Sequence, residues 1–205
     1  KAAFVNSPTS GMNYLLVIGG ATATGKTGLA IRLAQFFGTA VVSADSRQFY
    51  REMSIGTAKP TLQERVGVPH FFIDSLSVAN DFSVGQFEKE ALTVLNQIYQ
   101  NNSVAILAGG SGLFIKAVCE GLDAFPPVPE AVKKLVEDGE SEYGLGWLQQ
   151  QLLIHDPAYY RVVDKNNPAR LRRALEVCLA SGQPYTYFLA QGQTPRNFTP
   201  IFIQL

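Results

Sequence analysis

The stretch from Val17 to Ala30, VIGGATATGKTGLA, constrains this chain more than any other, because it inserts a glycine- and threonine-rich loop between a strand-like and a helix-like run. Within it, Gly20–Thr27 match the pattern G-x-x-x-x-G-K-[ST]. In that setting the loop N–H groups can surround a phosphate, and the helix N-terminus favours its negative charge. The pattern predicts a loop for a di- or triphosphate in which Lys26 neutralises phosphate oxygens and Thr27 binds Mg²⁺. A merely tight turn would need neither side chain.

Five apolar runs of strand length recur along the chain. They are continuous rather than alternating, which is typical of strands buried on both faces of a parallel sheet. Helical patterns separate them, over Thr27–Phe37 and again from Ser83, where Ser83 and Gln86 have the spacing of a capping box. The chain is therefore predicted to be α/β, with a P-loop NTPase-like, doubly wound, five-stranded parallel sheet. The runs are 14–20, 39–46, 70–76, 103–110 and 199–205.

The sequence pattern changes after Gly121, where a proline-rich connector leads into short amphipathic helices without strands. We expect a core over 12–122, a small helical insertion domain over 123–166, and a return to the core with the last strand over 167–205. Asn167 and Pro168 are typical of the cap and first residue of a helix that Gly182 ends. Residues 1–11 have no clear periodicity and are set aside as a native extension or a cloning remnant.

Composition limits the function classes. The 205 residues carry 17 Lys and Arg against 17 Asp and Glu, a net charge of zero, so any nucleic-acid contact must come from a local basic patch. Cys119 and Cys178 are expected to be buried, reduced thiols, and the isolated His70 and His155 make a metal cluster improbable. No apolar run approaches the ~18 residues of a membrane span and no cleavable signal is visible, so a soluble cytoplasmic protein is expected.

Further candidates lie at the ends of the other strands. Asp45 ends the second run, and because the carboxyl ends of strands face the ligand crevice, it should stand near the phosphate loop. There it could bind Mg²⁺ through water or act as a general base, or simply cap a turn. Asp74 ends the third run, either facing a metal or initiating a turn. The glycines of 108–112 allow a ligand to approach closely, or form a plain turn.

A basic helix face is the last candidate. Arg170 and Arg173 are three residues apart and share a face with each other, and Arg172 and Lys165 lie close by in sequence. Such a face could bind phosphates of a nucleic-acid backbone or of a diphosphate substrate, or be an ordinary solvated surface.

Taken together, GATATGKT, SADSRQFYREMSIGTAKP, HFFIDSL, AGGSGLFIKAVCEGL and NNPARLRRALEV resemble the tRNA dimethylallyltransferases of the IPP transferase family. The resemblance runs from about Leu15 to Leu205. It implies transfer of a dimethylallyl group from dimethylallyl diphosphate to the exocyclic amine of an adenosine next to the tRNA anticodon, with release of diphosphate. It further implies that the phosphate loop holds the donor's diphosphate rather than ATP, with Mg²⁺ as cofactor.

The resemblance also assigns residue roles. Asp45 matches the general base, Thr22 matches the threonine near the leaving group, and Lys26 completes the catalytic set. The diphosphate-binding set is Gly20, Ala21, Thr22, Ala23, Thr24, Gly25, Lys26 and Thr27, with Thr27 as the metal ligand. The tRNA-binding set is Asp45, Ser46, Arg47, Gln48, Ser111, Lys133, Ala169, Arg170, Leu171, Arg172 and Arg173. The expected partners are the tRNA anticodon stem-loop and dimethylallyl diphosphate, with no membrane, and the protein is expected to be a monomer.

Two departures and three rivals accompany this interpretation. Ala21 and Thr24 stand where many relatives have proline and serine, and relatives continue past the final IFIQL into helices that supply a further arginine, so we expect the remainder to be missing from this chain. The rivals are an adenylate isopentenyltransferase acting on a free nucleotide, an ATP-dependent small-molecule kinase on the same fold, and a non-catalytic nucleotide- or RNA-binding protein.

Overall fold

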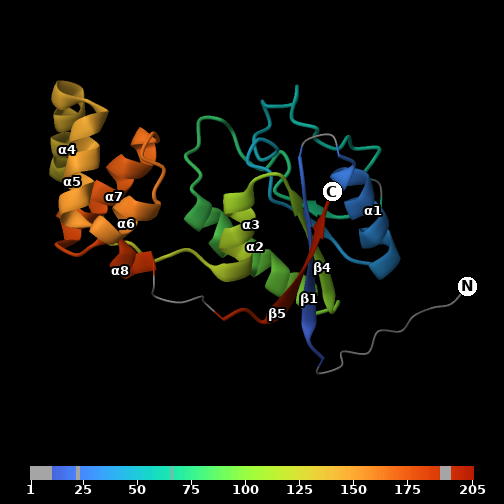
Figure 1. Cartoon of the computed structure of the whole chain (residues 1–205). Coiled ribbons are helices and arrows are strands. Elements are labelled where there is room, and N and C mark those ends of the chain that lie inside the picture. The colour runs from blue at the N-terminus through green and yellow to red at the C-terminus, as the bar shows by residue number, and fades with distance from the viewer. Residues whose placement is uncertain (1–10, 22–23, 66, 190–194) are drawn as a thin grey trace, which may run out of the picture. The chain divides into compact units, whose positions relative to one another are not determined.

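The computed structural model describes residues 11–21, 24–65, 67–189 and 195–205, which form two compact units (Figure 1). The sheet unit comprises the described residues up to Leu122 and from Pro195 onward. The helical unit runs from Asp123 to the last described helix, which ends at Leu189.

All five strands of the sheet unit are parallel and lie in the order β3-β2-β4-β1-β5. The sequence prediction of a five-stranded parallel α/β sheet is therefore confirmed. The third strand is much shorter than its apolar run, because Phe72 takes a φ of 60° and leaves the extended conformation. The strands are β1 (Asn13–Gly19), β2 (Val41–Ser43), β3 (His70–Phe71), β4 (Val104–Gly109) and β5 (Phe198–Gln204).

Helix α1 and the start of α2 lie close to where local signals predicted them. Helix α1 (Lys26–Phe37) stops at Gly38, whose φ of 63° is left-handed. Helix α2 (Val84–Tyr99) opens with both hydrogen bonds of the Ser83–Gln86 capping box. Helix α3 (Gly112–Glu120) follows β4 directly. Helix α1 thus connects β1 to β2 and α2 connects β3 to β4, as in a doubly wound fold, whereas α3 leads from β4 into the helical unit.

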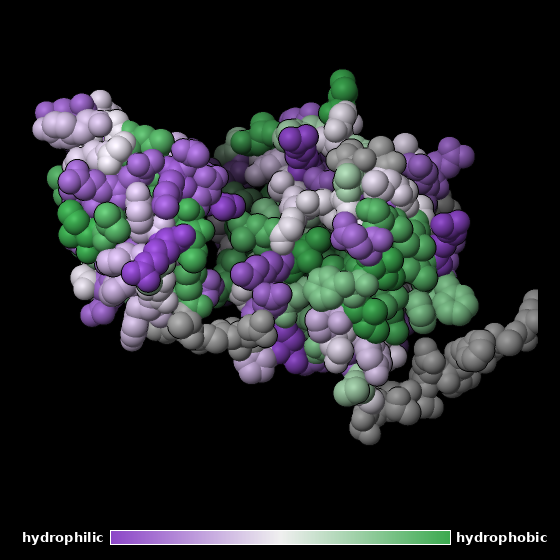
Figure 2. Space-filling view, in the orientation of Figure 1, coloured by the Kyte–Doolittle hydropathy of each residue, from purple (hydrophilic) through white to green (hydrophobic). Residues whose placement is uncertain are grey.

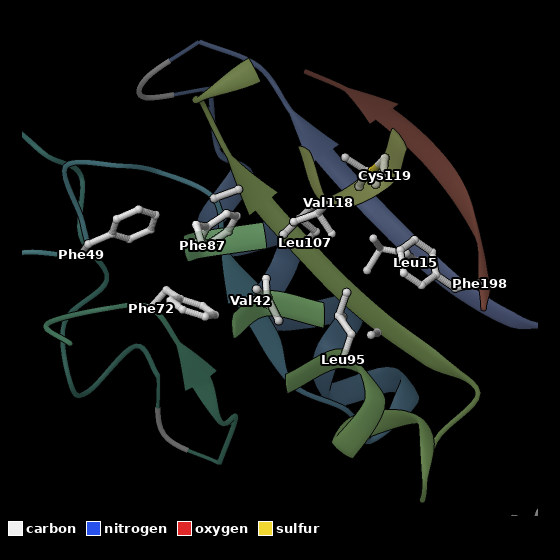
Figure 3. Packing of buried hydrophobic residues seen from close by; sticks show 14 residues of the cluster. Leu15, Val42, Phe49, Phe72, Phe87, Leu95, Leu107, Val118, Cys119 and Phe198 are labelled. Atoms are coloured by element: carbon white, nitrogen blue, oxygen red, sulfur yellow. The ribbon is translucent and has the colours of Figure 1, made fainter. Parts of the chain in front are cut away.

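Two cores lie on opposite faces of the sheet, with α2 and α3 over one face and α1 over the other (Figure 1). Leu15 and Leu107 face α2 and α3, and Ile18 and Ile106 face α1. Figure 3 shows how Leu95 of α2 and side chains of the strands fill the first core. Both faces are buried, which explains the continuous apolar runs in the sequence.

Strand β5 forms one edge of the sheet and keeps apolar side chains exposed. Ile201 is 43% exposed and Phe202 is 62% exposed. Hydrophobic residues gather over the face of the sheet unit that carries β5 and β1 in the space-filling view (Figure 2). This edge is therefore less covered than the centre of the sheet.

The helical unit has its own core beneath α7, in which Leu171 and Leu175 pack with Val136 and Leu148. The unit begins at Asp123, where the predicted insertion begins, but it extends past residue 166 and includes α7. The apolar stripe of α7 packs against α4 and α5, so this helix belongs to the helical unit. The sequence prediction, which assigned residues 167–205 to the core domain, was wrong for α7. The helices are α4 (Glu130–Tyr143), α5 (Leu145–His155), α6 (Pro157–Val162), α7 (Pro168–Ser181) and α8 (Tyr185–Leu189).

The two cysteines are buried and free, one in each unit, as expected. Burial raises the pKa of the Cys119 thiol to about 11, so this thiol stays protonated and unreactive at neutral pH. Across the described helices, none combines the length and apolar character that a membrane span requires.

Candidate functional site

One pocket collects residues from the phosphate loop and from the ends of three other strands. It is a cavity of about 270 Å³ lined entirely by the sheet unit. One part of its wall carries charged and N–H-bearing groups, namely Gly25, Lys26, Thr27 and Asp45. Another part is apolar and consists of Ala30, Val41, Ala58, Pro60, Ile73 and Ala108. The pocket can therefore accept a ligand with an anionic head and an apolar body.

The phosphate loop ends at the N-terminus of α1, where Gly25 takes a left-handed φ of 89°. Lys26 Nζ donates a hydrogen bond to the carbonyl oxygen of Ala21, and Thr24 Oγ1 donates to the same oxygen at 2.9 Å. The first turn of α1 contains no acidic residue, so its N-terminal N–H groups keep their positive potential for an anion. Thr22 and Ala23, both predicted to bind diphosphate, lie outside the described residues.

Asp45 lines the same pocket as Lys26 and Thr27, which is where its strand position predicted it. Its Oδ1 accepts a hydrogen bond from the backbone N–H of Arg47 at 3.1 Å. The ends of β2 and β4 approach closely here, because a Cβ on Gly109 would lie 2.3 Å from the backbone of Ala44. Gly109 therefore permits the strand spacing that brings Asp45 to the pocket.

Ser46 and Ser111 are hydrogen-bonded to each other, so the loop after β2 is tied to the start of α3. The backbone N–H of Ser46 donates to Ser111 Oγ at 3.1 Å, and Ser111 Oγ donates to Ser46 Oγ at 3.3 Å. Arg47 is exposed beside this pair. The structure thus brings together three residues that were predicted to contact tRNA, and their contact with RNA stays a prediction.

Gln48 differs from these neighbours because its side chain is buried, with 8% exposed. Its Oε1 accepts from Ser43 Oγ at 2.9 Å, and its Nε2 donates to the carbonyl oxygens of Thr57 and Ala58 at 3.2 and 3.3 Å. The side chain therefore fastens the 57–58 segment to β2. This geometry gives Gln48 a positioning role at the pocket wall, whereas its predicted contact with tRNA stays a prediction.

Asp74 is held by two cations. Its Oδ1 lies 2.7 Å from Lys59 Nζ, and its Oδ2 lies 3.5 Å from an Arg65 nitrogen. Lys59 also donates to the carbonyl oxygen of Tyr50 at 2.8 Å, and its side chain is only 7% exposed. With a φ of 54°, Asp74 forms a turn, so of the two alternatives left open the structure favours the turn over a metal-facing carboxylate.

Sequence reasoning did not identify His70, Ile73 or Lys59 as part of the site. His70 Nδ1 lies 2.9 Å from the carbonyl oxygen of Val68, which can only accept, so this nitrogen carries a proton. Burial lowers the pKa of His70, and the nearby Arg65 lowers it further. The only available signal was the position of His70 and Ile73 at the two ends of the run HFFI.

Within the described part of the chain, no group of three or more His, Cys, Asp and Glu side chains is placed to hold a metal ion. Mg²⁺ does not require such a cluster, because it keeps several waters and is often held by one or two protein oxygens together with phosphate oxygens. The Thr27 hydroxyl and the Asp45 carboxylate line one pocket and suit that kind of binding.

The predicted RNA contacts of the helical unit divide into two kinds. Ala169 and Arg170 lie exposed in the first turn of α7, which Asn167 caps by accepting from the Arg170 N–H at 3.2 Å. Arg173 is also exposed, 5.6 Å from the ring centroid of Phe125. Lys133 on α4 pairs with Glu130 at 3.0 Å in an exposed (i, i+3) pair.

The other two predicted contacts on α7 have structural roles. Leu171 is fully buried in the core of the helical unit. Arg172 forms an ion pair with Glu140 of α4 at 2.7 Å, and this hydrogen bond raises the pKa of the guanidinium. The exposed residues of α7 are therefore better placed to meet a partner than Leu171 and Arg172.

The chain is similar to proteins of one family. A sequence model of the family described as IPP transferase matches residues 48–205. The chain is 47% identical over 193 residues to the tRNA dimethylallyltransferase of Christiangramia forsetii, covering 94% of this chain and 64% of that relative. It therefore spans less than two thirds of the length of the curated relatives it matches.

Two solved structures resemble the fold. A eukaryotic dimethylallyltransferase acting on tRNA superposes with a TM-score of 0.79 at 24% identity, over 94% of this chain and 48% of the other, a likeness that concerns the fold alone. A tRNA delta(2)-isopentenylpyrophosphate transferase from Staphylococcus epidermidis superposes with a TM-score of 0.56 at 31% identity, over 94% and 63%.

Proposed function

The chain belongs to the IPP transferase family, and from that premise we propose that the protein transfers a dimethylallyl group from dimethylallyl diphosphate to the exocyclic amine of an adenosine in tRNA. The relatives named above are tRNA dimethylallyltransferases, which supports this choice of donor and acceptor. We further propose that the adenosine lies next to the anticodon and that the protein acts as a monomer.

One observation carries the proposal. A single pocket combines the phosphate-loop residues Lys26 and Thr27, the carboxylate of Asp45 and an apolar wall. A prenyl diphosphate needs the first and the third of these, and an attacking amine needs the second.

The proposed reaction balances with the groups of this chain. The amine nitrogen of adenosine forms a bond to the allylic carbon, and the bond from that carbon to the diphosphate oxygen breaks, with its electron pair leaving on the oxygen. The Asp45 carboxylate accepts the proton that the amine loses. Lys26 and the N–H groups at the start of α1 stabilise the charge on the departing diphosphate.

Mg²⁺ fits this site with the Thr27 hydroxyl as its protein ligand. When bound, it would add positive charge beside the diphosphate. The exposed side chains of Arg47, Arg170 and Arg173 are proposed to contact the RNA backbone, together with the partly exposed Lys133. The adenine must leave its stack to reach the pocket, as in other enzymes that modify a base.

The decisive experiment incubates the full-length protein with an anticodon stem-loop RNA, Mg²⁺ and dimethylallyl diphosphate, and measures the RNA by mass spectrometry. We expect one dimethylallyl group on a loop adenosine. Asp45→Asn should lower the rate by about 100-fold or more with little loss of RNA binding, whereas the exposed Asp81→Asn should behave like the wild type. Prenylated AMP beside unmodified RNA would indicate the free-nucleotide enzyme, and ATP turnover alone would indicate a kinase.

A further inference from the structure

Ile73 stands in the pocket wall between two residues with left-handed backbones. Phe72 has a φ of 60° and Asp74 has a φ of 54°, conformations that side chains other than glycine rarely adopt. Such strained residues persist only where surrounding contacts hold them, and they are often found at functional sites. The backbone around Ile73 is therefore fixed by contacts made elsewhere in the sheet unit.

Those contacts are visible on both sides. The ring of Phe72 lies 4.9 Å from that of Phe87 and 6.1 Å from that of Phe49, in a cluster of aromatic side chains (Figure 3). Asp74 pairs with Lys59 at 2.7 Å, and its N–H donates to the carbonyl oxygen of Gln48 at 3.1 Å. Ile73 is held from both flanks and cannot easily withdraw from the pocket.

The apolar part of the pocket is built mostly from small side chains. Ala30, Ala58 and Ala108 contribute one methyl group each, whereas Ile73 contributes a branched four-carbon side chain. Val41 and Pro60 contribute three side-chain carbons each, so Ile73 carries the largest apolar side chain in the pocket wall. A diphosphate bound at Lys26 and Thr27 would direct its apolar tail toward this wall, away from the charged groups.

We propose that Ile73 limits the prenyl donor to a single isoprene unit, so that geranyl diphosphate, with two units, is excluded by this side chain. The inference rests on the proposed function and adds to it the residue that selects the donor's length. A pocket discriminates between chain lengths through contacts worth about 10- to 200-fold per methylene. Because its flanks are fixed, Ile73 acts as a rigid stop for the tail.

The test measures the affinity of the full-length protein for the thiodiphosphate analogues of dimethylallyl and geranyl diphosphate, together with transfer of both prenyl groups to RNA. The wild type should prefer the shorter donor by about 10-fold or more, and Ile73→Ala should reduce that preference by about 10-fold. Ile73→Val should shift it in the same direction by less, which keeps the test valid if the alanine variant fails to fold. Ile55→Ala, at a side chain 98% exposed, is the matched control and should leave the preference unchanged.

The outcomes separate the two proposals. If the wild type transfers the dimethylallyl group but folded Ile73→Ala and Ile73→Val keep the wild-type preference, the role of Ile73 is refuted and the proposed function stands. Equal use of both donors by the wild type refutes it as well. If the wild type binds neither analogue and modifies no RNA, the proposed function and the inference that rests on it both fail.

Discussion

The pocket of the sheet unit and the basic surface of α7 are built in opposite ways. The pocket takes residues from five separate chain segments and depends on buried polar side chains such as those of Gln48 and Lys59. The surface of α7 consists of exposed side chains on one helix, which packs through the apolar stripe on its opposite side. Substitutions near the pocket should therefore act through the geometry of the whole unit, whereas substitutions on α7 should act one charge at a time.

The largest effect is expected from Gly109→Ala. The added Cβ would lie 2.3 Å from the backbone of Ala44, so β2 and β4 must move apart and the pocket must distort. We expect a loss of about 3 kcal/mol in the free energy of unfolding, measured by urea denaturation followed by circular dichroism.

Gly110→Ala is the matched control for that prediction. A Cβ on Gly110 would lie 3.6 Å from the nearest atom, an ordinary contact, so this variant should unfold close to the wild type. Equal stability of the two variants would show that β2 and β4 tolerate a wider spacing. It would contradict the expectation that substitutions near the pocket act through the geometry of the whole sheet unit.

The second effect, on the helical unit, concerns Gly139 in α4. A Cβ there would lie 2.3 Å from the indole ring of Trp147, where α4 and α5 pack closely. We expect Gly139→Ala to destabilise this unit by about 1–2 kcal/mol, since overpacking outweighs the gain of about 1 kcal/mol in helix propensity. Near-ultraviolet circular dichroism of the single tryptophan during urea denaturation follows this unit.

Gly146→Ala in α5 has open space around its Cβ and should stabilise the same unit by up to about 1 kcal/mol. If both alanine variants gain stability, the α4–α5 contact is less tight than the structure has it. If Gly139→Ala instead destabilises the sheet unit to the same extent, the stabilities of the two units are coupled and α7 is not independent of the pocket.

The sequence predicted the features that depend on neighbouring residues better than those that depend on distant contacts. The helix after the phosphate loop, the capping box at Ser83 and the helix opened by Asn167 depend on short-range patterns, and each lies where it was predicted. The pocket wall at Ile73 depends on the φ of Phe72 and on the pairing of Lys59 with Asp74, 15 residues away, which no local pattern encodes.

The assignment of α7 to the wrong unit also results from a dependence on distant contacts. Its apolar stripe, which includes Leu171 and Leu175, shows that one side must be buried but does not show against what. The packing partners, among them Val136 and Leu148, belong to helices that precede it in the chain, and they place α7 in the helical unit. Sequence periodicity thus predicts burial but leaves the partner open.

The exposed arginines of α7 should affect RNA binding more than the arginine that is already paired. If exposed arginines contact RNA phosphates, Arg170→Ala should weaken binding of an anticodon stem-loop and reduce the slope of log affinity against log salt by about 0.7–0.9. Arg172→Ala should change the slope less, because Arg172 is already paired with Glu140. Fluorescence anisotropy at several salt concentrations measures the affinity and its salt slope for each variant. Equal slopes for Arg170→Ala and Arg172→Ala would contradict the separate roles of the exposed and the paired arginine.

The smallest expected effect is the pH dependence of stability that results from the burial of His70. Burial lowers the pKa of His70 in the folded protein, so as pH falls through the ordinary histidine value of about 6.5 the unfolded chain binds a proton first. Folding stability contributed by neutral His70 should therefore be fully present above that pH and decline below it.

His70→Asn, whose amide can still donate to Val68, should make the loss of stability between pH 7 and pH 5 smaller, measured by urea denaturation at each pH. His155→Gln, on the exposed end of α5, is the matched control from the helical unit, and an equal change in both variants would mean that pocket burial is not the cause.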